Sequence, residues 1–229
     1  MINSARAELI RRDLRMRSVF DALLIALQPR IVCDIGSYNG DEAARFRRIL
    51  PEAHIFAFEG SIDNVERFMR PREDLQYVNI ENVAVSDRDG EEVFHILEAN
   101  PEGVDWRRMA NSLNVRTDEL PSREVRVRSV SLDSYFAAEI EAQDTFALWI
   151  DVEGALDKVL KGAEKVLSRA VVVKAEVERA EFWKQQKLVD EIVDLMEAGG
   201  FILIGDTFVE GASAQSDALF LRRDWLNSL

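Results

Sequence analysis

The chain has 229 residues, of which 47% are hydrophobic and 31% charged, and this composition is typical of one globular domain with its own core. Its 29 basic and 42 acidic residues give a net charge of −13, which argues against a nucleic-acid backbone as the main ligand. The single cysteine, Cys33, excludes an internal disulfide and is interpreted as core packing. No apolar run approaches the ~20 residues of a membrane span, and the charged N-terminus lacks a secretory pattern, so a cytoplasmic location without membrane partners is expected.

The N-terminal segment, residues 5–27, predicts an amphipathic helix that ends before Pro29. We expect it to form a helical extension, residues 1–29, to a domain that spans residues 30–229. A solvated face is the simpler interpretation of the basic cluster on this helix, and contact with an anionic substrate or a partner is the alternative. The cluster consists of Arg11, Arg12, Arg15 and Arg17.

The next segment is an apolar run, residues 31–35, which breaks at Gly36 and is followed after Gly40 by a helix with one apolar face. A buried strand, a tight turn and a helix open a nucleotide-binding α/β fold. The spacing Gly36-x-x-x-Gly40 matches a pyrophosphate site poorly, so an adenosine ligand without pyrophosphate, such as S-adenosylmethionine, fits better. Asp34 and Asp41 flank the turn, where carboxylates would repel phosphates but attract ammonium and sulfonium charges.

A second apolar strand, residues 54–58, ends at Glu59. An acid at this position can accept hydrogen bonds from both ribose hydroxyls of an adenosine, and the alternative is a surface carboxylate at a strand end. Residues 77–85 predict a third strand, closed by turn residues at 86–90, and residues 91–97 predict a further extended segment.

A long polar loop is expected at residues 98–122. Loops of this length in compact domains are usually functional or disordered, and we expect this one to shape an acceptor pocket, with Trp106 and Asn111 as candidate substrate contacts. Residues 124–130 alternate charged and apolar side chains, as a strand solvated on one face does, and residues 131–136 predict a short capped helix.

The remaining elements predict a mostly parallel sheet with helices on both faces, because strands and helices alternate along the chain. A final antiparallel hairpin suits a seven-stranded methyltransferase sheet better than a dehydrogenase sheet. These elements are strands at 147–151 and 170–177, helices at 156–167 and 188–196, and the hairpin strands at 201–204 and 218–221.

Two acids, Asp151 and Glu153, follow the fourth core strand at its carboxyl end, where open α/β sheets bind ligands. Such a carboxylate could take the proton of an acceptor hydroxyl as a methyl group moves. Alternatively, Asp151 caps the next helix and Glu153 favours its N-terminus electrostatically. Glu176 and Glu178 end the neighbouring strand; Glu176 is a candidate substrate contact, and all four acids could hold a divalent cation, which is the less favoured interpretation, so no metal is assigned.

The two histidines are weaker candidates. His54 enters a strand at the end opposite the expected ligand site, so a structural role is predicted. His95 could act as a base, but its place between Phe94 and Ile96 favours packing at a sheet surface.

Four stretches of the chain resemble the FkbM-type methyltransferases, a family of S-adenosylmethionine-dependent O-methyltransferases. The resemblance covers roughly residues 30–205, and its most specific part is a strand followed by acid-x-acid-Gly and then Leu-Lys-Gly-Ala. The stretches are residues 34–40, 58–64, 82–90 and 150–163.

The resemblance implies a cofactor site. The turn at Gly36 would line the methionine end of the cofactor, Glu59 would bind the ribose, and Asp151 would lie at the methyl-transfer centre. Two departures from the family pattern are Gly60, where a proline is usual, and Trp149, where a lysine is usual and where a change could reshape the floor of the substrate site. The implied cofactor residues are Asp34, Gly36, Ser37, Gly40, Glu59, Gly60, Ala84, Val85, Ser86 and Asp151.

We therefore expect a Rossmann-like α/β methyltransferase with S-adenosyl-L-methionine as cofactor. Its acceptor would be a hydroxyl of a sugar or a polyketide-like small molecule, with no nucleic-acid partner. One alternative is a nicotinamide-dependent oxidoreductase, which the glycine spacing disfavours, and another is a non-catalytic module that binds the cofactor or a partner protein. The sequence leaves the oligomeric state open, with a homo-oligomer as one option.

Overall fold

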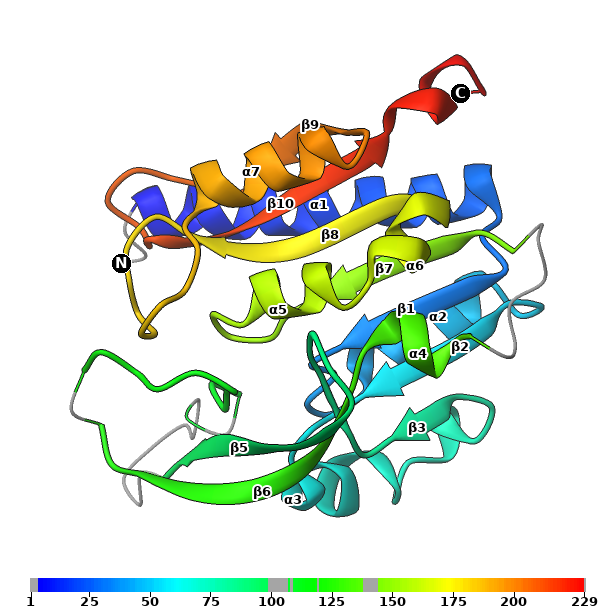
Figure 1. Ribbon diagram of the computed structural model, residues 1–229. Coiled ribbons are helices and arrows are strands. Elements are labelled where there is room, and N and C mark those ends of the chain that lie inside the picture. The colour runs from blue at the N-terminus through cyan, green and yellow to red at the C-terminus, as the bar shows by residue number, and fades with distance from the viewer. Residues whose placement is uncertain (1–3, 99–106, 108, 119, 138–143, 229) are drawn as a thin grey trace.

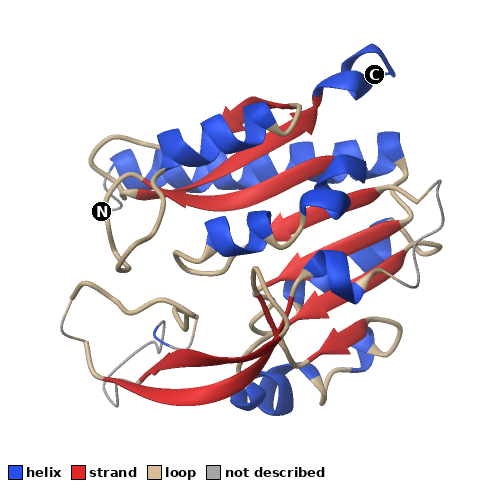
Figure 2. Cartoon of the chain, in the orientation of Figure 1, coloured by secondary structure: helices blue, strands red, loops and turns tan. Residues whose placement is uncertain are grey.

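The computed structural model describes residues 4–98, 107, 109–118, 120–137 and 144–228. Within them, helices cover both faces of a central sheet, and a smaller sheet lies beside its carboxyl-terminal edge (Figures 1 and 2). The described elements are α1 (Ser4–Leu27), β1 (Ile31–Ile35), α2 (Asp41–Ile49), β2 (His54–Phe58), α3 (Ile62–Asn64), the π-helix η1 (Val65–Met69), the 3₁₀ helix η2 (Glu73–Leu75), β3 (Asn79–Glu81), β4 (Ala84–Val85), β5 (Gly90–Leu97), β6 (Ser122–Val130), α4 (Leu132–Tyr135), β7 (Phe146–Ile150), α5 (Leu156–Lys161), α6 (Glu164–Arg169), β8 (Ala170–Glu178), α7 (Val189–Ala198), β9 (Phe201–Asp206), β10 (Gln215–Arg222) and the 3₁₀ helix η4 (Arg223–Ser228).

The large sheet has seven strands in the order β3-β2-β1-β7-β8-β10-β9. The pairings from β3 to β8 are parallel, whereas β10 runs antiparallel to both β8 and β9. The predicted fold class and the predicted terminal hairpin are therefore confirmed. The strand order reverses between β1 and β7, so the turns after these two strands meet at the point where open α/β sheets bind ligands.

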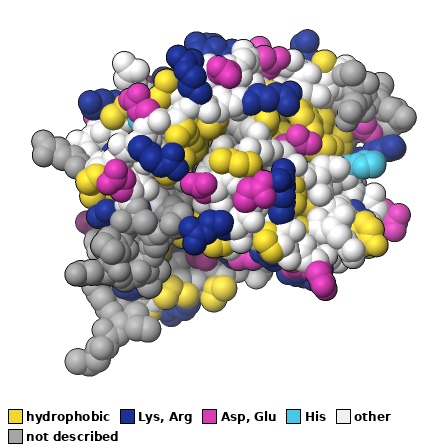
Figure 3. All heavy atoms as spheres, turned by 90° about the horizontal axis from the view of Figure 1, so that it is seen from below, with side chains coloured by type: hydrophobic (Ala, Val, Ile, Leu, Met, Phe, Trp, Pro, Cys, Tyr) yellow, Lys and Arg dark blue, Asp and Glu magenta, His cyan; other side chains and the backbone are white. Residues whose placement is uncertain are grey.

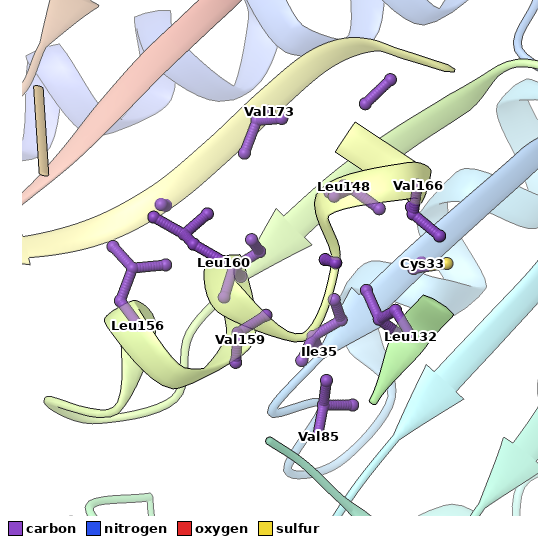
Figure 4. Packing of buried hydrophobic residues seen from close by; sticks show 14 of the residues in the cluster. Cys33, Ile35, Val85, Leu132, Leu148, Leu156, Val159, Leu160, Val166 and Val173 are labelled. Carbon is purple, nitrogen blue, oxygen red and sulfur yellow. The ribbon is translucent and has the colours of Figure 1, made fainter. Parts of the chain in front are cut away.

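Each face of the sheet has its own hydrophobic core, because successive strand residues point to opposite sides. In Figure 4, Val159 of α5 lies next to Ile35 and Val166 of α6 lies next to Leu148, and buried Cys33 belongs to the same cluster, as predicted. Figure 1 shows α1 and α2 behind the sheet, and Phe20 of α1 lies in the core on that face.

Two local predictions are wrong. Residues 77–85 do not form one strand, since β3 pairs with β2, while β4 pairs with β6 in a separate sheet of order β4-β6-β5. The predicted helix at 156–167 is broken at Gly162, where an added Cβ would lie 2.0 Å from the carbonyl oxygen of Ser86. Both breaks depend on contacts between distant segments, which local periodicity does not reveal.

Helix α1 packs against α2, β8, β9 and β10. Two of its arginines bind groups of this chain, since Arg12 Nη1 donates to the carbonyl oxygen of Phe208 at 2.7 Å and Arg17 forms an ion pair with Glu42. The prediction that the arginines of this helix form a solvated face is therefore wrong for Arg12 and Arg17. The division into an extension and a domain stays a prediction, and no helix in the described part of the chain is long and apolar enough to cross a membrane.

Candidate active site

A pocket opens at the carboxyl ends of β1, β2 and β7. One end is polar and presents Glu59 and Asp151 next to the backbone of Gly36, and the other end is apolar. The apolar wall includes Phe58, Val83, Ala84, Val85, Phe94 and Leu113.

The turn after β1 brings two distant turns into contact. Gly36, Tyr38 and Gly40 have φ angles of +80°, +51° and +79°, so alternate residues of this turn are left-handed. A Cβ at Gly36 would lie 1.7 Å from the carbonyl oxygen of Asp151, and only glycine lets the turn after β7 approach so closely. A Cβ at Gly40 would instead meet the side chain of Leu75 at 2.6 Å, so Gly40 allows packing away from the pocket.

The carboxylate of Glu59 is held in place by three donors of the chain. One oxygen accepts from the backbone N–H of Tyr38 at 2.8 Å, and the other from the backbone N–H of Ser61 at 2.7 Å and from Nδ2 of Asn64 at 3.3 Å. The side chain is 5% exposed, and burial raises the pKa of Glu59 to about 7. Each carboxylate oxygen has two lone pairs, so the group can still accept hydrogen bonds from a ligand.

The apolar end of the pocket joins the two sheets. Ala84 and Val85 on β4 and Phe94 on β5 face Gly60, where an added Cβ would lie 3.1 Å from the ring of Phe94. Gly60, the departure from the family pattern, thus lies directly against this wall. Phe94 is a pocket residue that the sequence pattern does not mark, because it is one of four apolar residues on β5.

Four of the predicted cofactor residues do not line the pocket: Asp34, Ser37, Gly40 and Ser86. Asp34 is 1% exposed and accepts from the hydroxyl of Ser37 at 2.5 Å and from the N–H of Ala43 at 3.1 Å, which satisfies a free donor in the first turn of α2. Burial raises its pKa to about 7. Ser86 is buried, and its N–H donates to the carbonyl oxygen of Val130 at 2.9 Å. Their roles as cofactor contacts stay predictions.

An acidic cluster lies next to the pocket. One carboxylate oxygen each of Asp151, Glu153 and Glu176 falls within 4.8 Å of the others. Burial, the charge of Asp151 and that of Glu178 raise the pKa of Glu153 well above its usual value, and burial with the charge of Asp151 does the same for Glu176. The predicted cap by Asp151 is wrong, because α5 begins after Ala155 and has no side-chain cap, whereas the electrostatic effect of Glu153 on this helix stays a prediction.

A buried cation, Lys174, lies beside this cluster. Its Nζ is 2.6 Å from Oδ1 of Asp217 and 4.4 Å from the ring centroid of Trp149. Burial lowers the pKa of Lys174, but the charges of Asp217 and Asp151 outweigh it and raise the pKa above its usual value. Trp149 itself packs edge-on against Phe20 under α1 at 5.1 Å, and it does not line the pocket.

Of the predicted substrate contacts, one lines the pocket and the others do not belong to its described lining. Asn111 lines the pocket, and its Oδ1 accepts from the N–H of Leu97 at 3.1 Å. Glu176 belongs to the acidic cluster rather than to the pocket lining, and Trp106 lies outside the described residues. His54 lies at the start of β2, away from the pocket, as predicted, but its side chain is exposed, so its structural role stays a prediction. His95 lies on β5 with its backbone paired to Ser112.

The fold is that of the methyltransferases. Among solved structures, magnesium protoporphyrin IX methyltransferase from Synechocystis PCC 6803 with bound SAM is similar with a TM-score of 0.50 and 11% identity, over 97% of this chain and 85% of that one. WbdD, in a co-crystal with a kinase inhibitor, has a TM-score of 0.51 and 15% identity, over 93% of this chain but only 40% of its own.

The sequence comparisons name the family. Residues 34–203 match the methyltransferase FkbM domain, and the chain belongs to this family of methyltransferases. The 2-O-methyltransferase NoeI of Sinorhizobium fredii (strain NBRC 101917 / NGR234) is 27% identical over 191 residues, which cover 79% of this chain and 76% of that protein. The predicted family and enzyme class are confirmed, and the oxidoreductase alternative is set aside.

Proposed function

We propose that this chain is an S-adenosylmethionine-dependent O-methyltransferase whose acceptor is a hydroxyl of a sugar or a polyketide-like small molecule. The observation that carries the proposal is a single pocket that presents both Glu59 and Asp151 beside an apolar wall. The family membership and the name of the 2-O-methyltransferase relative support transfer to oxygen.

The residues of the pocket fit an adenosine with a cationic tail. Glu59 is fixed by its three donors and can accept from ribose hydroxyls, while Ala84, Val85 and Phe94 offer an apolar slot for a base. The acids beside the pocket, Asp151, Glu153 and Glu176, would together attract the sulfonium and ammonium charges, so cofactor binding does not depend on one of them. When bound, the cofactor supplies an electrophilic methyl group on sulfur.

Asp151 is the residue of the chain that would take the proton of the acceptor. Its backbone is fixed by an N–H bond to the carbonyl oxygen of Ile35 at 2.8 Å, and it lines the pocket at the end of β7. A carboxylate at this place can remove the hydroxyl proton as the O–CH₃ bond forms. Glu153 lies two residues further along in the same acidic cluster, where neighbouring negative charge strengthens the tendency of a carboxylate to take up a proton.

The acceptor is proposed to be a small molecule rather than a nucleic acid because of the charge of the chain. On the face in Figure 3, basic and acidic side chains are mixed, without one large basic surface, and the net charge of the chain is −13. A phosphate backbone finds little attraction in such a distribution.

The cofactor part is tested by calorimetry with S-adenosylmethionine and with NAD. We expect binding of S-adenosylmethionine, loss of this binding in Glu59→Ala, and unchanged binding in Glu66→Ala, a control on the half-exposed side chain that pairs with Arg70. Tight binding of NAD without binding of S-adenosylmethionine would overturn the proposal.

The catalytic part is tested with Asp151→Asn, which keeps the shape of the side chain. Cofactor affinity should be retained, while formation of S-adenosylhomocysteine with a set of sugar and polyketide-like acceptors should fall by about 10²–10⁴-fold. Normal turnover in this variant would show that Asp151 is not the base. A wild type that binds the cofactor but methylates none of the acceptors would favour the non-catalytic module.

A further inference from the structure

The acidic cluster next to the pocket is built by three neighbouring strands. Glu176 and Glu178 are two residues apart on β8, so their side chains lie on the same face of the sheet. On β10, Asp217 lies opposite Glu176 and Gln215 opposite Glu178. The turn after β7 adds the remaining two acids, Asp151 and Glu153.

The neutralising groups of this region do not reach all of these acids. The buried ammonium of Lys174 forms its ion pair with Asp217 at 2.6 Å. Nε2 of Gln215 reaches Oε2 of Glu153 at 3.5 Å, at the long limit of a hydrogen bond. Among the described residues, no basic side chain forms an ion pair with Asp151, Glu153, Glu176 or Glu178.

Two of the acids have buried oxygens without any partner. Glu178 is 2% exposed, and its Oε1 accepts no hydrogen bond; the same holds for Oε2 of Glu176. The backbone partner of Glu178 on β10 is Gln215, and the amide of Gln215 reaches Glu153. The unpartnered carboxylate of Glu178 therefore lies beside the acidic cluster. A buried carboxylate oxygen without a donor is unfavourable, more so when it is charged, which indicates that a ligand belongs there.

We propose that Asp151, Glu153 and Glu176 bind one divalent cation, each through a carboxylate oxygen, with Glu178 as a fourth acid behind them. Opposite ligands of a cation with metal–oxygen distances of about 2.0–2.6 Å lie about 4–5 Å apart. The three oxygens lie within 4.8 Å of one another, which fits this span. Carboxylate ligands select hard cations such as Mg²⁺, Mn²⁺ and Ca²⁺.

The cation would border the pocket, because Asp151 belongs to both. Open coordination positions would then face the acceptor hydroxyl and could orient it, a role that rests on the proposed function. Binding of the cation alone needs neither cofactor nor acceptor, so the two proposals can be tested separately.

The experiment titrates the chelator-treated full chain with Mn²⁺ and measures free Mn²⁺ by electron paramagnetic resonance. We expect one saturable site per chain, which Glu176→Gln weakens by about tenfold or more. The matched control is Glu210→Gln, at an exposed acid in the turn between β9 and β10, and its affinity should equal that of the wild type. Glu178→Gln serves as a second variant and should also weaken the site.

A wild type without a saturable site, or Glu176→Gln and Glu178→Gln variants that both bind like the wild type, would overturn the proposal. Thermal unfolding without cation checks that the variants fold, and their melting temperature should be retained or raised because repulsion between the acids is relieved. Binding of S-adenosylmethionine without a Mn²⁺ site would overturn the cation site alone. A Mn²⁺ site without binding of S-adenosylmethionine would overturn the proposed function alone.

Discussion

Two groups of buried carboxylates flank the turn after β1, and they differ in how their oxygens are satisfied. On the side of β1 and β2, Asp34 and Glu59 accept hydrogen bonds from backbone and side-chain donors of the chain. On the side of β7 and β8, Glu176 and Glu178 keep oxygens without a partner. The carboxylates beside β1 and β2 are held by donors of the chain, and Glu59 among them suits a neutral ligand such as a ribose. The carboxylates beside β7 and β8 have oxygens without a donor and suit a cation.

The largest expected effect comes from breaking the contact between these two sides. Gly36→Ala places a Cβ 1.7 Å from the carbonyl oxygen of Asp151 at a φ of +80°, so we expect a loss of about 3 kcal/mol or more in the free energy of unfolding. Urea denaturation measures this loss. Gly205→Ala on β9 is the control, since its Cβ would meet nothing within 4 Å, and it should change stability by less than about 1 kcal/mol. Equal stability of the two variants would contradict the tight contact.

A second prediction concerns the satisfied carboxylate of Asp34. Its folded pKa of about 7 exceeds the ~4 of an unfolded chain, so the folded state binds the proton more tightly, and this stabilisation is lost as the pH rises through about 7. Asp34→Asn keeps the acceptor oxygen without the charge. Between about pH 5 and 7, the unfolding free energy of the variant should fall less steeply than that of the wild type, by up to about 1.4 kcal/mol per pH unit. Parallel curves from denaturation at several pH values would count against this assignment.

The smallest expected effect is a pH dependence of cofactor affinity, and it tests the role of Glu59. Its pKa of about 7 means that the ionised acceptor is depleted below neutral pH. Affinity for S-adenosylmethionine should therefore fall by about tenfold from pH 8 to pH 6, since protonation removes the better hydrogen-bond acceptor. Calorimetry at both values measures this change, and Glu59→Gln should show a flat profile. A wild-type affinity that does not vary with pH would speak against the ribose contact.

The part of the site built from local signals was predictable from the sequence. Apolar runs that end in Gly36, Glu59 and Asp151 mark buried strands and their carboxyl ends, and parallel strands place these ends along one edge. The structure brings all three to one pocket. Local sequence patterns also predict the terminal hairpin and the short helix capped by Ser131, and the structure contains both.

The part built from distant contacts was not predictable in this way. Phe94 reaches the pocket only because β4 leaves the main sheet and pairs with β6, beside which β5 lies. The pairing of Lys174 with Asp217 depends on the antiparallel insertion of β10 next to β8. A single sequence shows neither strand register nor partner choice, because side-chain periodicity is the same for any partner.

The positions of α1 and β10 limit how far this chain can be truncated, because α1 packs on one face of the sheet and β10 pairs within it. The family match ends at residue 203, yet β9 pairs only with β10 in the sheet order, and Phe20 of α1 packs in the core against the face that carries Trp149. A chain shortened to the matched residues would leave an unpaired edge and a bare apolar face, the two features that drive aggregation. For bacterial expression or domain fusion, the useful boundaries are therefore those of the packed core rather than those of the family match.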